Sequence, residues 1–246
     1  MDTKSEILHL FPGEKQLEQL FDWELVEWYY QFLADNNEAG GFFSKKDSEH
    51  IVTRHLAESA YHVSVITGKI AVSRETKICD LGTGPGLPGF LFYCLREKPD
   101  VTLLDSQGRR LKFLQQSSSG LAAKDKLHFV YARAEEHGKQ YDLVVSRSFV
   151  PYPFSAELAL RMIKKNGYYI PFLGNLFLED DVEAEYLRRL GLELEETCEL
   201  EKLSFLGKRH IKLLKKTGKP VHGYPRPWKT ITKEIQKYNG QDHINQ

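Results

Sequence analysis

A glycine-rich segment with one acidic residue is the part of this sequence whose residue types and spacing point most clearly to ligand binding. It reads Asp80-Leu-Gly-Thr-Gly-Pro-Gly-Leu-Pro-Gly89, and Gly84, Gly86 and Gly89 satisfy the pattern G-x-G-x-x-G. Glycines at such positions let the backbone approach a ligand closely. No Lys-Ser or Lys-Thr ends the loop, so the segment is not a nucleoside-triphosphate P-loop.

Asp80 decides which ligand the loop favours. It lies two residues before Gly82, at the expected end of a strand. A carboxylate there opposes a pyrophosphate, since two unit charges about 4 Å apart interact by roughly 4 kcal/mol near a protein surface. The same carboxylate favours a ligand with an ammonium and a sulfonium, as in S-adenosylmethionine. Asp105, at the end of the next strand, can accept hydrogen bonds from both ribose hydroxyls.

Two other interpretations of the loop stay open. The literal G-x-G-x-x-G match, with Asp105 near the usual spacing, is also the dinucleotide fingerprint of an NAD-dependent oxidoreductase. Asp80 is alternatively a helix N-cap or turn residue with no ligand.

The elements that position these residues follow from the hydrophobic pattern after residue 77. Short apolar runs alternate with helical stretches, which is typical of a parallel sheet covered on both faces. The expected strands are 77–81, 101–104, 127–131, 141–145 and 167–172, and the expected helices are 86–97, 109–118, 153–164 and 179–190. Two further runs, 192–203 and 210–214, are close enough to pair antiparallel.

The pattern divides the chain into three parts. Helical periodicity over 16–33 and 48–66 predicts an N-terminal helical cap over 1–70. A ligand-binding α/β domain follows over 71–216. Prolines at 220, 225 and 227 predict an irregular tail over 217–246.

Composition excludes several classes of protein. The chain has 246 residues, 41% of them hydrophobic, and no apolar run long enough for a membrane span. Its three cysteines have no paired spacing, so we expect a reducing compartment, a cytoplasmic protein and no metal site.

The chain has a formal net charge of zero, but its C-terminal part is basic. Residues 202–237 hold 11 Lys and Arg against the single acid Glu234. Such a segment attracts a polyanion or is a solvated tail. We expect removal of residues 217–246 to weaken binding of a polyanion such as RNA while sparing affinity for the ligand of the glycine loop.

Two more short polar segments come directly after expected strands. Arg133-Ala-Glu135 comes after the third strand, where a nucleoside-binding sheet meets adenine, and Ser146-Arg147-Ser148 comes after the fourth. Arg147 can reach a cofactor carboxylate, a base or a phosphate, or it simply pairs with an acid.

The chain resembles the bacterial small-subunit rRNA guanine-N7 methyltransferase family, also called glucose-inhibited division protein B, over roughly residues 14–235. The resemblance rests on the glycine loop and on Thr102-Leu-Leu-Asp-Ser106, with Arg133-Ala-Glu135 and Val145-Ser-Arg-Ser148 after them. It also includes Gly207-Lys-Arg-His210 and Tyr224-Pro-Arg226. Departures from the family pattern include Glu58 where Asp is usual and Leu173 where Lys is usual.

The resemblance implies a class I, Rossmann-like methyltransferase sheet that uses S-adenosylmethionine to methylate a guanine in the decoding-region hairpin of 16S rRNA. With the loop residues discussed above, the expected cofactor-binding residues are Asp80, Gly82, Gly84, Gly86, Leu87, Asp105, Ser106, Ala134, Glu135 and Arg147. Arg147 is also the expected catalytic residue. The expected RNA-binding residues are Arg54, His55, Arg109, Arg110, Lys208, Arg209, His210 and Arg226.

Guanine N7 has a free lone pair, so its methylation needs no general base, and the sequence holds no convincing acid–base pair. The expected partner is 16S rRNA or the small ribosomal subunit, with no membrane and no metal, and we expect a monomer. A ribosome-assembly factor that binds RNA without catalysis is the third interpretation.

Overall fold

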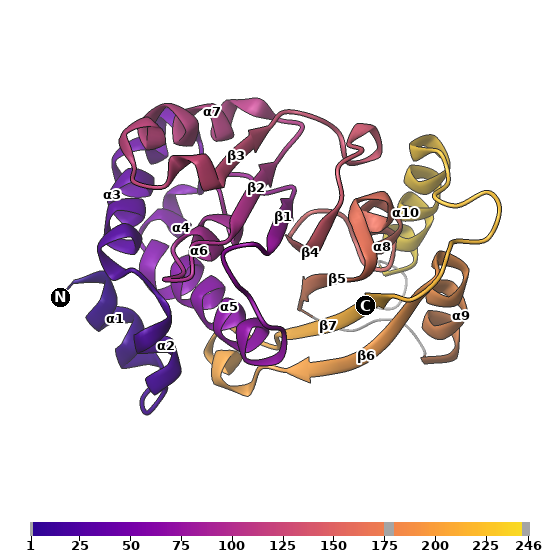
Figure 1. Ribbon diagram of the computed structural model, residues 1–246, viewed down its shortest axis with the longest axis horizontal. Coiled ribbons are helices and arrows are strands. Elements are labelled where there is room, and N and C mark those ends of the chain that lie inside the picture. Colours follow the sequence, from indigo (N-terminus) through magenta and orange to yellow (C-terminus); the bar gives the residue numbers. More distant parts are fainter. Residues whose placement is uncertain (1, 175–179, 243–246) are drawn as a thin grey trace.

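The centre of the molecule is a mixed sheet between two layers of helices (Figure 1). The computed structural model describes residues 2–174 and 180–242, and within them the sheet has seven strands in the order β3-β2-β1-β4-β5-β7-β6. The strands are β1 (Lys77–Leu81), β2 (Asp100–Leu104), β3 (Leu127–Val130), β4 (Tyr141–Arg147), β5 (Ile163–Leu173), β6 (Leu192–Glu199) and β7 (His210–Lys216). Only β7 pairs antiparallel, with β5 and β6, so the predicted parallel sheet with a C-terminal hairpin is confirmed.

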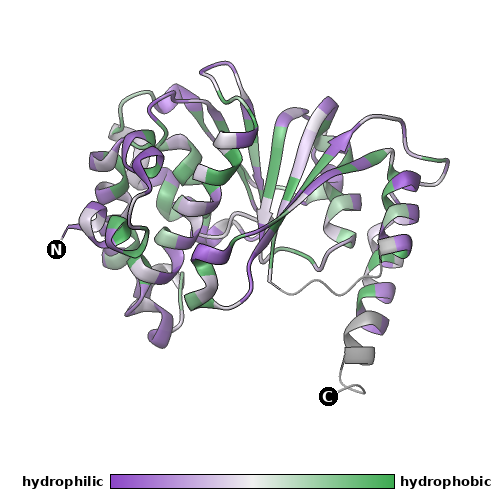
Figure 2. Cartoon of the chain, turned by 90° about the horizontal axis from the view of Figure 1, so that it is seen from below, coloured by the Kyte–Doolittle hydropathy of each residue, from purple (hydrophilic) through white to green (hydrophobic). Residues whose placement is uncertain are grey.

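Helices cover both faces of the sheet. They are α1 (Thr3–Leu10), α2 (Lys15–Leu20), α3 (Trp23–Gly40), α4 (Lys45–Ser48), α5 (Ala57–Lys69), α6 (Gly89–Tyr93), α7 (Gly108–Ser117), α8 (Phe154–Ala159), α9 (Asp180–Leu190) and α10 (Trp228–Asp242). Side chains alternate along a strand, so Ile78 joins the core cluster under α1–α7 while Cys79 and Leu81 join the one under α8–α10. Figure 2 shows hydrophobic segments in the strands and in the helices on both sides of the sheet.

The order of the strands determines where a ligand can bind. Chain connections from β1 lead to β2 and β3 on one side, while β4 and β5 lie on the other. The carboxyl ends of these parallel strands share one edge, and the crevice where the order reverses is the usual ligand site of such sheets. The glycine loop after β1 and the loop after β4 meet at this crevice.

The N-terminal helices are more interrupted than the periodicity predicts. The expected helix 16–33 is broken before Trp23, because Asp22 ends one segment and its carboxylate accepts the Leu25 N–H at 3.3 Å as the N-cap of α3. The expected helix 48–66 contains a π-helical stretch, Ile51–Leu56, before α5. Such stretches are frequent at functional sites, and this one carries Arg54 and His55.

Several predicted boundaries after residue 77 are wrong. Helix α6 covers only Gly89–Tyr93, and Ile163 begins β5 instead of continuing a helix. Strand β6 ends at Glu199, and a 3-10 helix follows over Glu201–Leu206. The division of the chain at residues 70 and 216 stays a prediction.

The prediction of an irregular tail is wrong for residues 228–242, which form α10. Pro227 precedes the helix and does not interrupt it, and its carbonyl accepts the Thr230 N–H at 2.8 Å. Ile231 is 0% exposed, so α10 packs on the second core cluster and is not a free tail.

The Arg226 guanidinium anchors this segment. Its Nη2 donates to Glu157 Oε2 at 2.8 Å, and the Glu157 side chain is 0% exposed. Further bonds go to Glu234 and to the Tyr186 hydroxyl. The structure thus gives this predicted RNA-binding residue an internal partner.

We expect Arg226→Ala to lower the free energy of unfolding by about 3 kcal/mol, because it leaves the buried Glu157 carboxylate without its cation. Urea unfolding measures this. The control is Arg188→Ala, whose pair with Glu185 is exposed and contributes about 1 kcal/mol or less. Equal losses in both variants would contradict the anchoring role.

Candidate functional site

A cavity of about 510 Å³ lies at the carboxyl ends of the parallel strands. Six of the ten residues predicted to bind a cofactor line it: Gly82, Gly84, Asp105, Ser106, Ala134 and Glu135. The four that do not are Asp80, Gly86, Leu87 and Arg147. We call this space the donor cavity.

The glycine loop needs its glycines for two physical reasons. Gly82 and Gly84 have φ of +73° and +58°, a region that side chains disfavour. A Cβ on Gly82 would also lie 2.3 Å from the Phe149 ring, and a Cβ on Gly89 would lie 2.6 Å from Asp80 Cβ. The loop therefore folds tightly over the end of β1, with Phe149 against it.

Asp80 lies beneath the loop instead of in the cavity. Its side chain is buried, and its Oδ2 accepts the Thr83 hydroxyl at 2.5 Å and the Gly89 N–H at 2.7 Å. These bonds join the end of β1 to the loop and to the first residue of α6. The other oxygen, Oδ1, is buried and has no hydrogen-bond partner among the described residues.

The environment of Asp80 alters its ionisation. Burial raises the pKa of its carboxyl to about 7, although the bonds from Thr83 and Gly89 and the charge of Arg147 act in the opposite direction. The group is therefore poised to gain or lose a proton near neutral pH.

Asp105 closes the opposite side of the loop. Its Oδ2 accepts the Gly84 N–H at 2.8 Å, and its Oδ1 accepts the Gln107 N–H at 2.7 Å. A carboxylate oxygen has two lone pairs, so both oxygens retain the capacity to accept a ligand hydroxyl. Asp105 is half-buried at the cavity wall, as a ribose-binding role requires.

A second cavity, of about 300 Å³, holds the basic residues around Arg147. It lies beside Arg54, His55, Glu58 and Arg209, and we call it the arginine cavity. Ser148 lines both cavities, which therefore adjoin at the end of β4. The φ of Ser148 is +52°, and strained backbone of this kind clusters at functional sites.

One carboxylate organises the arginine cavity. Glu58, on α5, accepts Arg147 Nη1 at 2.8 Å through one oxygen and Arg209 Nε through the other. Burial opposes ionisation of Glu58, but the charges of Arg147, His62 and Arg209 hold its pKa below the usual value. Burial, reinforced by Arg147, lowers the pKa of His55 to about 4, so His55 is neutral at pH 7.

These charges add to a net positive site. Two guanidiniums share one carboxylate beside a neutral histidine, and Arg54, whose own partner is Asp47, lies at the rim. The arrangement suits an anionic or hydrogen-bond-accepting ligand.

The other predicted RNA-binding residues are dispersed. Lys208 is exposed next to Arg209, and Arg110 lines the donor cavity. Arg109 donates to the Ala39 carbonyl at 2.9 Å. His210 is buried in β7 with its Nδ1 2.9 Å from the Gly174 carbonyl oxygen, so it is a framework residue.

Sequence reasoning missed three parts of the donor cavity: Ser148–Val150 as a wall, Leu158 on α8, and Trp228 from the C-terminal segment. The motif Ser146-Arg147-Ser148 pointed to the first. Nothing in the local pattern around Trp228 connects it to a loop 146 residues earlier.

In the described residues, no helix is both long and apolar enough to cross a bilayer. The same residues contain no group of three or more His, Cys, Asp or Glu side chains arranged for a metal ion.

Comparison with known proteins gives consistent matches. A family model described as rRNA small subunit methyltransferase G matches residues 22–204. Proteins named ribosomal RNA small subunit methyltransferase G from Leptospira interrogans and Leptospira biflexa are each 47% identical to this chain, over 96% and 97% of it and 92% and 97% of the relatives.

Among solved structures, magnesium protoporphyrin IX methyltransferase from Synechocystis with bound S-adenosylmethionine has a similar fold. The TM-score is 0.56 at 15% identity, with 77% of this chain and 97% of that one covered. The predicted class I methyltransferase fold is thereby confirmed.

The buried Asp80 carboxyl predicts a pH effect on stability. Its pKa is about 7 in the folded protein and 3.8 for an ordinary Asp, so between these values the folded state binds more protons and loses stability as pH rises. Asp80→Asn does not titrate, and its stability relative to the wild type should rise by about 2 kcal/mol between pH 5 and pH 8.

Urea unfolding at both pH values measures this difference. The control Asp125→Asn removes an exposed carboxylate near the amino end of β3. A wild-type-minus-variant difference that is independent of pH would contradict the assignment for Asp80.

Proposed function

The chain belongs to the rRNA small subunit methyltransferase G family, and we propose that it methylates N7 of a guanine in the decoding-region hairpin of 16S rRNA. Family and fold make it an S-adenosylmethionine-dependent rRNA methyltransferase. The target atom and the hairpin come from the sequence resemblance. Such an enzyme is expected in the cytoplasm, and we keep the expectation of a monomer.

The observation that carries this proposal is the contact between two cavities of different chemistry. The wall of the donor cavity carries two carboxylates, Asp105 and Glu135, that balance two guanidiniums, Arg110 and Arg133. The arginine cavity has more cations than anions. Both are lined by Ser148, so the two cavities are neighbours, as a donor site and an acceptor site must be. Carboxylates are thus available for the hydroxyl and cationic groups of a donor in the first cavity, and excess guanidiniums for a polyanionic acceptor at the second.

The residues present fit S-adenosylmethionine. The cofactor supplies a methyl group activated on a positive sulfur. Asp105 would hold the ribose hydroxyls, and Ala134 and Glu135, after β3, would lie against the adenine. Asp80 does not line the cavity; from beneath the loop its carboxyl holds the turn through Thr83 and Gly89 and would act on a ligand only through its charge. These roles argue against the NAD alternative, because a buried carboxyl below the loop disfavours a pyrophosphate.

In the arginine cavity the task is to orient a base. Guanine presents N7 and O6 as acceptors on one edge. Arg147, fixed by Glu58, can donate to O6 and leave the N7 lone pair free for the methyl carbon. N7 carries no proton, so alignment and exclusion of water are the contributions expected of the protein.

The proposal predicts methyl transfer to small-subunit rRNA. Labelled S-adenosylmethionine and small subunits from a strain that lacks this gene should give 7-methylguanosine in 16S rRNA after nucleoside analysis. Label in another nucleoside would overturn the N7 assignment. Binding of S-adenosylhomocysteine and of subunits without transfer would favour the assembly factor, and binding of NADH alone would favour the oxidoreductase.

Lys208 offers a test of the RNA-binding surface. It is exposed, and its ammonium makes no salt bridge within the described residues. We expect Lys208→Gln to weaken RNA binding and to reduce the slope of log K against log salt by about one, while affinity for S-adenosylhomocysteine stays unchanged.

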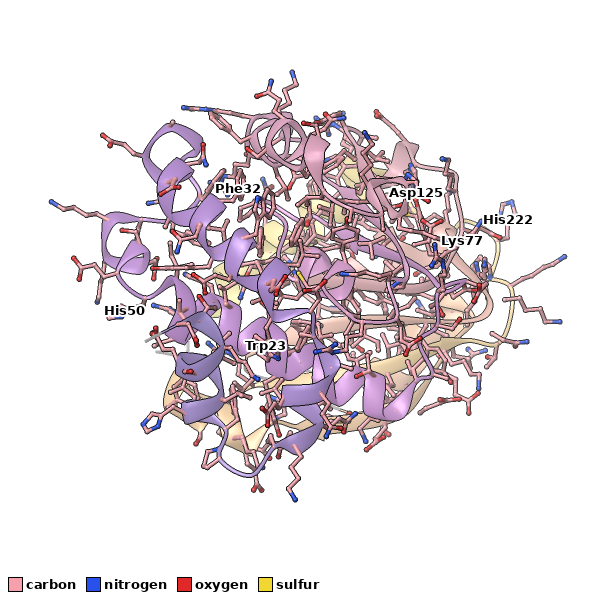
Figure 3. All side chains as sticks on the ribbon, turned by 60° about the vertical axis from the view of Figure 1, so that its left-hand side comes forward. Trp23, Phe32, His50, Lys77, Asp125 and His222 are labelled. Atoms are coloured by element: carbon pink, nitrogen blue, oxygen red, sulfur yellow. The ribbon has the colours of Figure 1, made fainter. Side chains whose placement is uncertain are left out.

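Lys124→Gln is the matched control. Lys124 is an exposed lysine next to Asp125, at the amino ends of the strands. Figure 3 shows Asp125 and Lys77 on the opposite side of the molecule from His50, which directly precedes the stretch with Arg54. An identical salt slope in both lysine variants would remove Lys208 from the RNA surface.

A further inference from the structure

The donor cavity has a wall that comes from outside the α/β sheet. Trp228, the first residue of α10, lines it together with Leu158 of α8 and Glu135. The indole is half-buried and packs on the core cluster beneath α8–α10. None of the predicted cofactor-binding residues lies in the C-terminal segment that contains Trp228.

Trp228 lies at the end of the donor cavity that Glu135 and Leu158 form. A neighbouring cavity of about 280 Å³ shares Glu135, Leu158 and Trp228 with the donor cavity and continues among Pro225, Arg226 and Pro227. Gly82 and Gly84, by contrast, line only the donor cavity. The indole therefore stands between the two spaces at the end formed by Glu135, away from the glycine loop.

That end is the one we assign to adenine. Asp105 follows β2, and Ala134 and Glu135 follow β3, the next strand outward. A ribose on Asp105 therefore directs its base toward Glu135. Adenine is flat and aromatic, and an indole face or edge with a Leu side chain gives it apolar contact.

The indole is held in place by the segment before it. The Val221 N–H donates to the Arg189 carbonyl at 2.9 Å, which attaches the chain to α9. Arg226, two residues before Trp228, is fixed to the buried Glu157 of α8. Ile231 is buried one turn later. Figure 1 shows α10 on the same side of the sheet as α8.

We propose that Trp228 forms the adenine wall of the donor site, so that the C-terminal segment is part of the S-adenosylmethionine site and not only an RNA-binding tail. The inference rests on the proposed function, since it needs an adenosine-containing donor. It also changes an expectation from the sequence: loss of residues 217–246 removes this wall and cannot spare donor affinity.

Titration calorimetry with S-adenosylhomocysteine on the full chain tests the proposal. Trp228→Ala should raise Kd about tenfold, because the base loses its aromatic contact and the two cavities merge. Trp228→Phe keeps a ring and should stay within about threefold of the wild type. An unchanged Kd in Trp228→Ala would overturn the proposal. Failure of the wild type to bind would instead overturn the proposed function.

Fluorescence gives a second readout that does not depend on how well Trp228→Ala folds. The chain has three tryptophans, and Trp23 and Trp28 lie in α3, on the other face of the sheet. S-adenosylhomocysteine should change the emission of the wild type and of Trp28→Phe. Trp228→Phe should lose that change while still binding by calorimetry. A signal that persists in Trp228→Phe would place the ligand away from the indole.

Discussion

The buried carboxyl of Asp80 is the interaction on which the donor site depends. Its bonds to the Thr83 hydroxyl and the Gly89 N–H fix the turn between β1 and α6, and this turn forms the floor of the donor cavity. A carboxylate buried at this depth is costly unless it is protonated or paired. One oxygen accepts two hydrogen bonds and the other has no donor among the residues that the structure describes, so the bonds to Thr83 and Gly89 shape the loop without a ligand.

The carboxylate of Glu58 fixes the arginine cavity as Asp80 fixes the glycine loop, by holding Arg147 and Arg209 in place. Glu58 belongs to the N-terminal helices, while Arg147 ends β4 and Arg209 precedes β7. The pairs therefore attach the helical layer to two strands of the sheet at the point where the cavities adjoin. The glutamate at position 58, where the family pattern has aspartate, uses both of its carboxylate oxygens in this bridge.

The sequence predicted the sheet well, because short apolar runs between helical stretches and glycine spacing are local signals. Strand β1 was predicted at its observed bounds, and Asp105 and Glu135 at the cavity wall follow from strand ends alone. Asp80 shows the limit of such reasoning. Its position suggested direct ligand contact, whereas in the folded protein its side chain turns beneath the loop to the Gly89 N–H. Burial and partner choice are tertiary properties, so spacing cannot supply them.

The C-terminal segment shows that net charge, too, does not predict which side chains are buried. The eleven cations of residues 202–237 left open a polyanion-binding segment or a solvated tail, and three prolines predicted an irregular tail after residue 217, because net charge and Pro content do not show where side chains point. In the fold, Arg226 turns inward to Glu157 and Ile231 is buried, while Lys229, Lys233 and Lys237 remain exposed four residues apart. One short helix thus presents lysines to solvent and, through Trp228, a wall to the donor cavity. If Trp228 has the adenine role proposed for it, an RNA bound to these lysines and a donor in the cavity would contact the same helix.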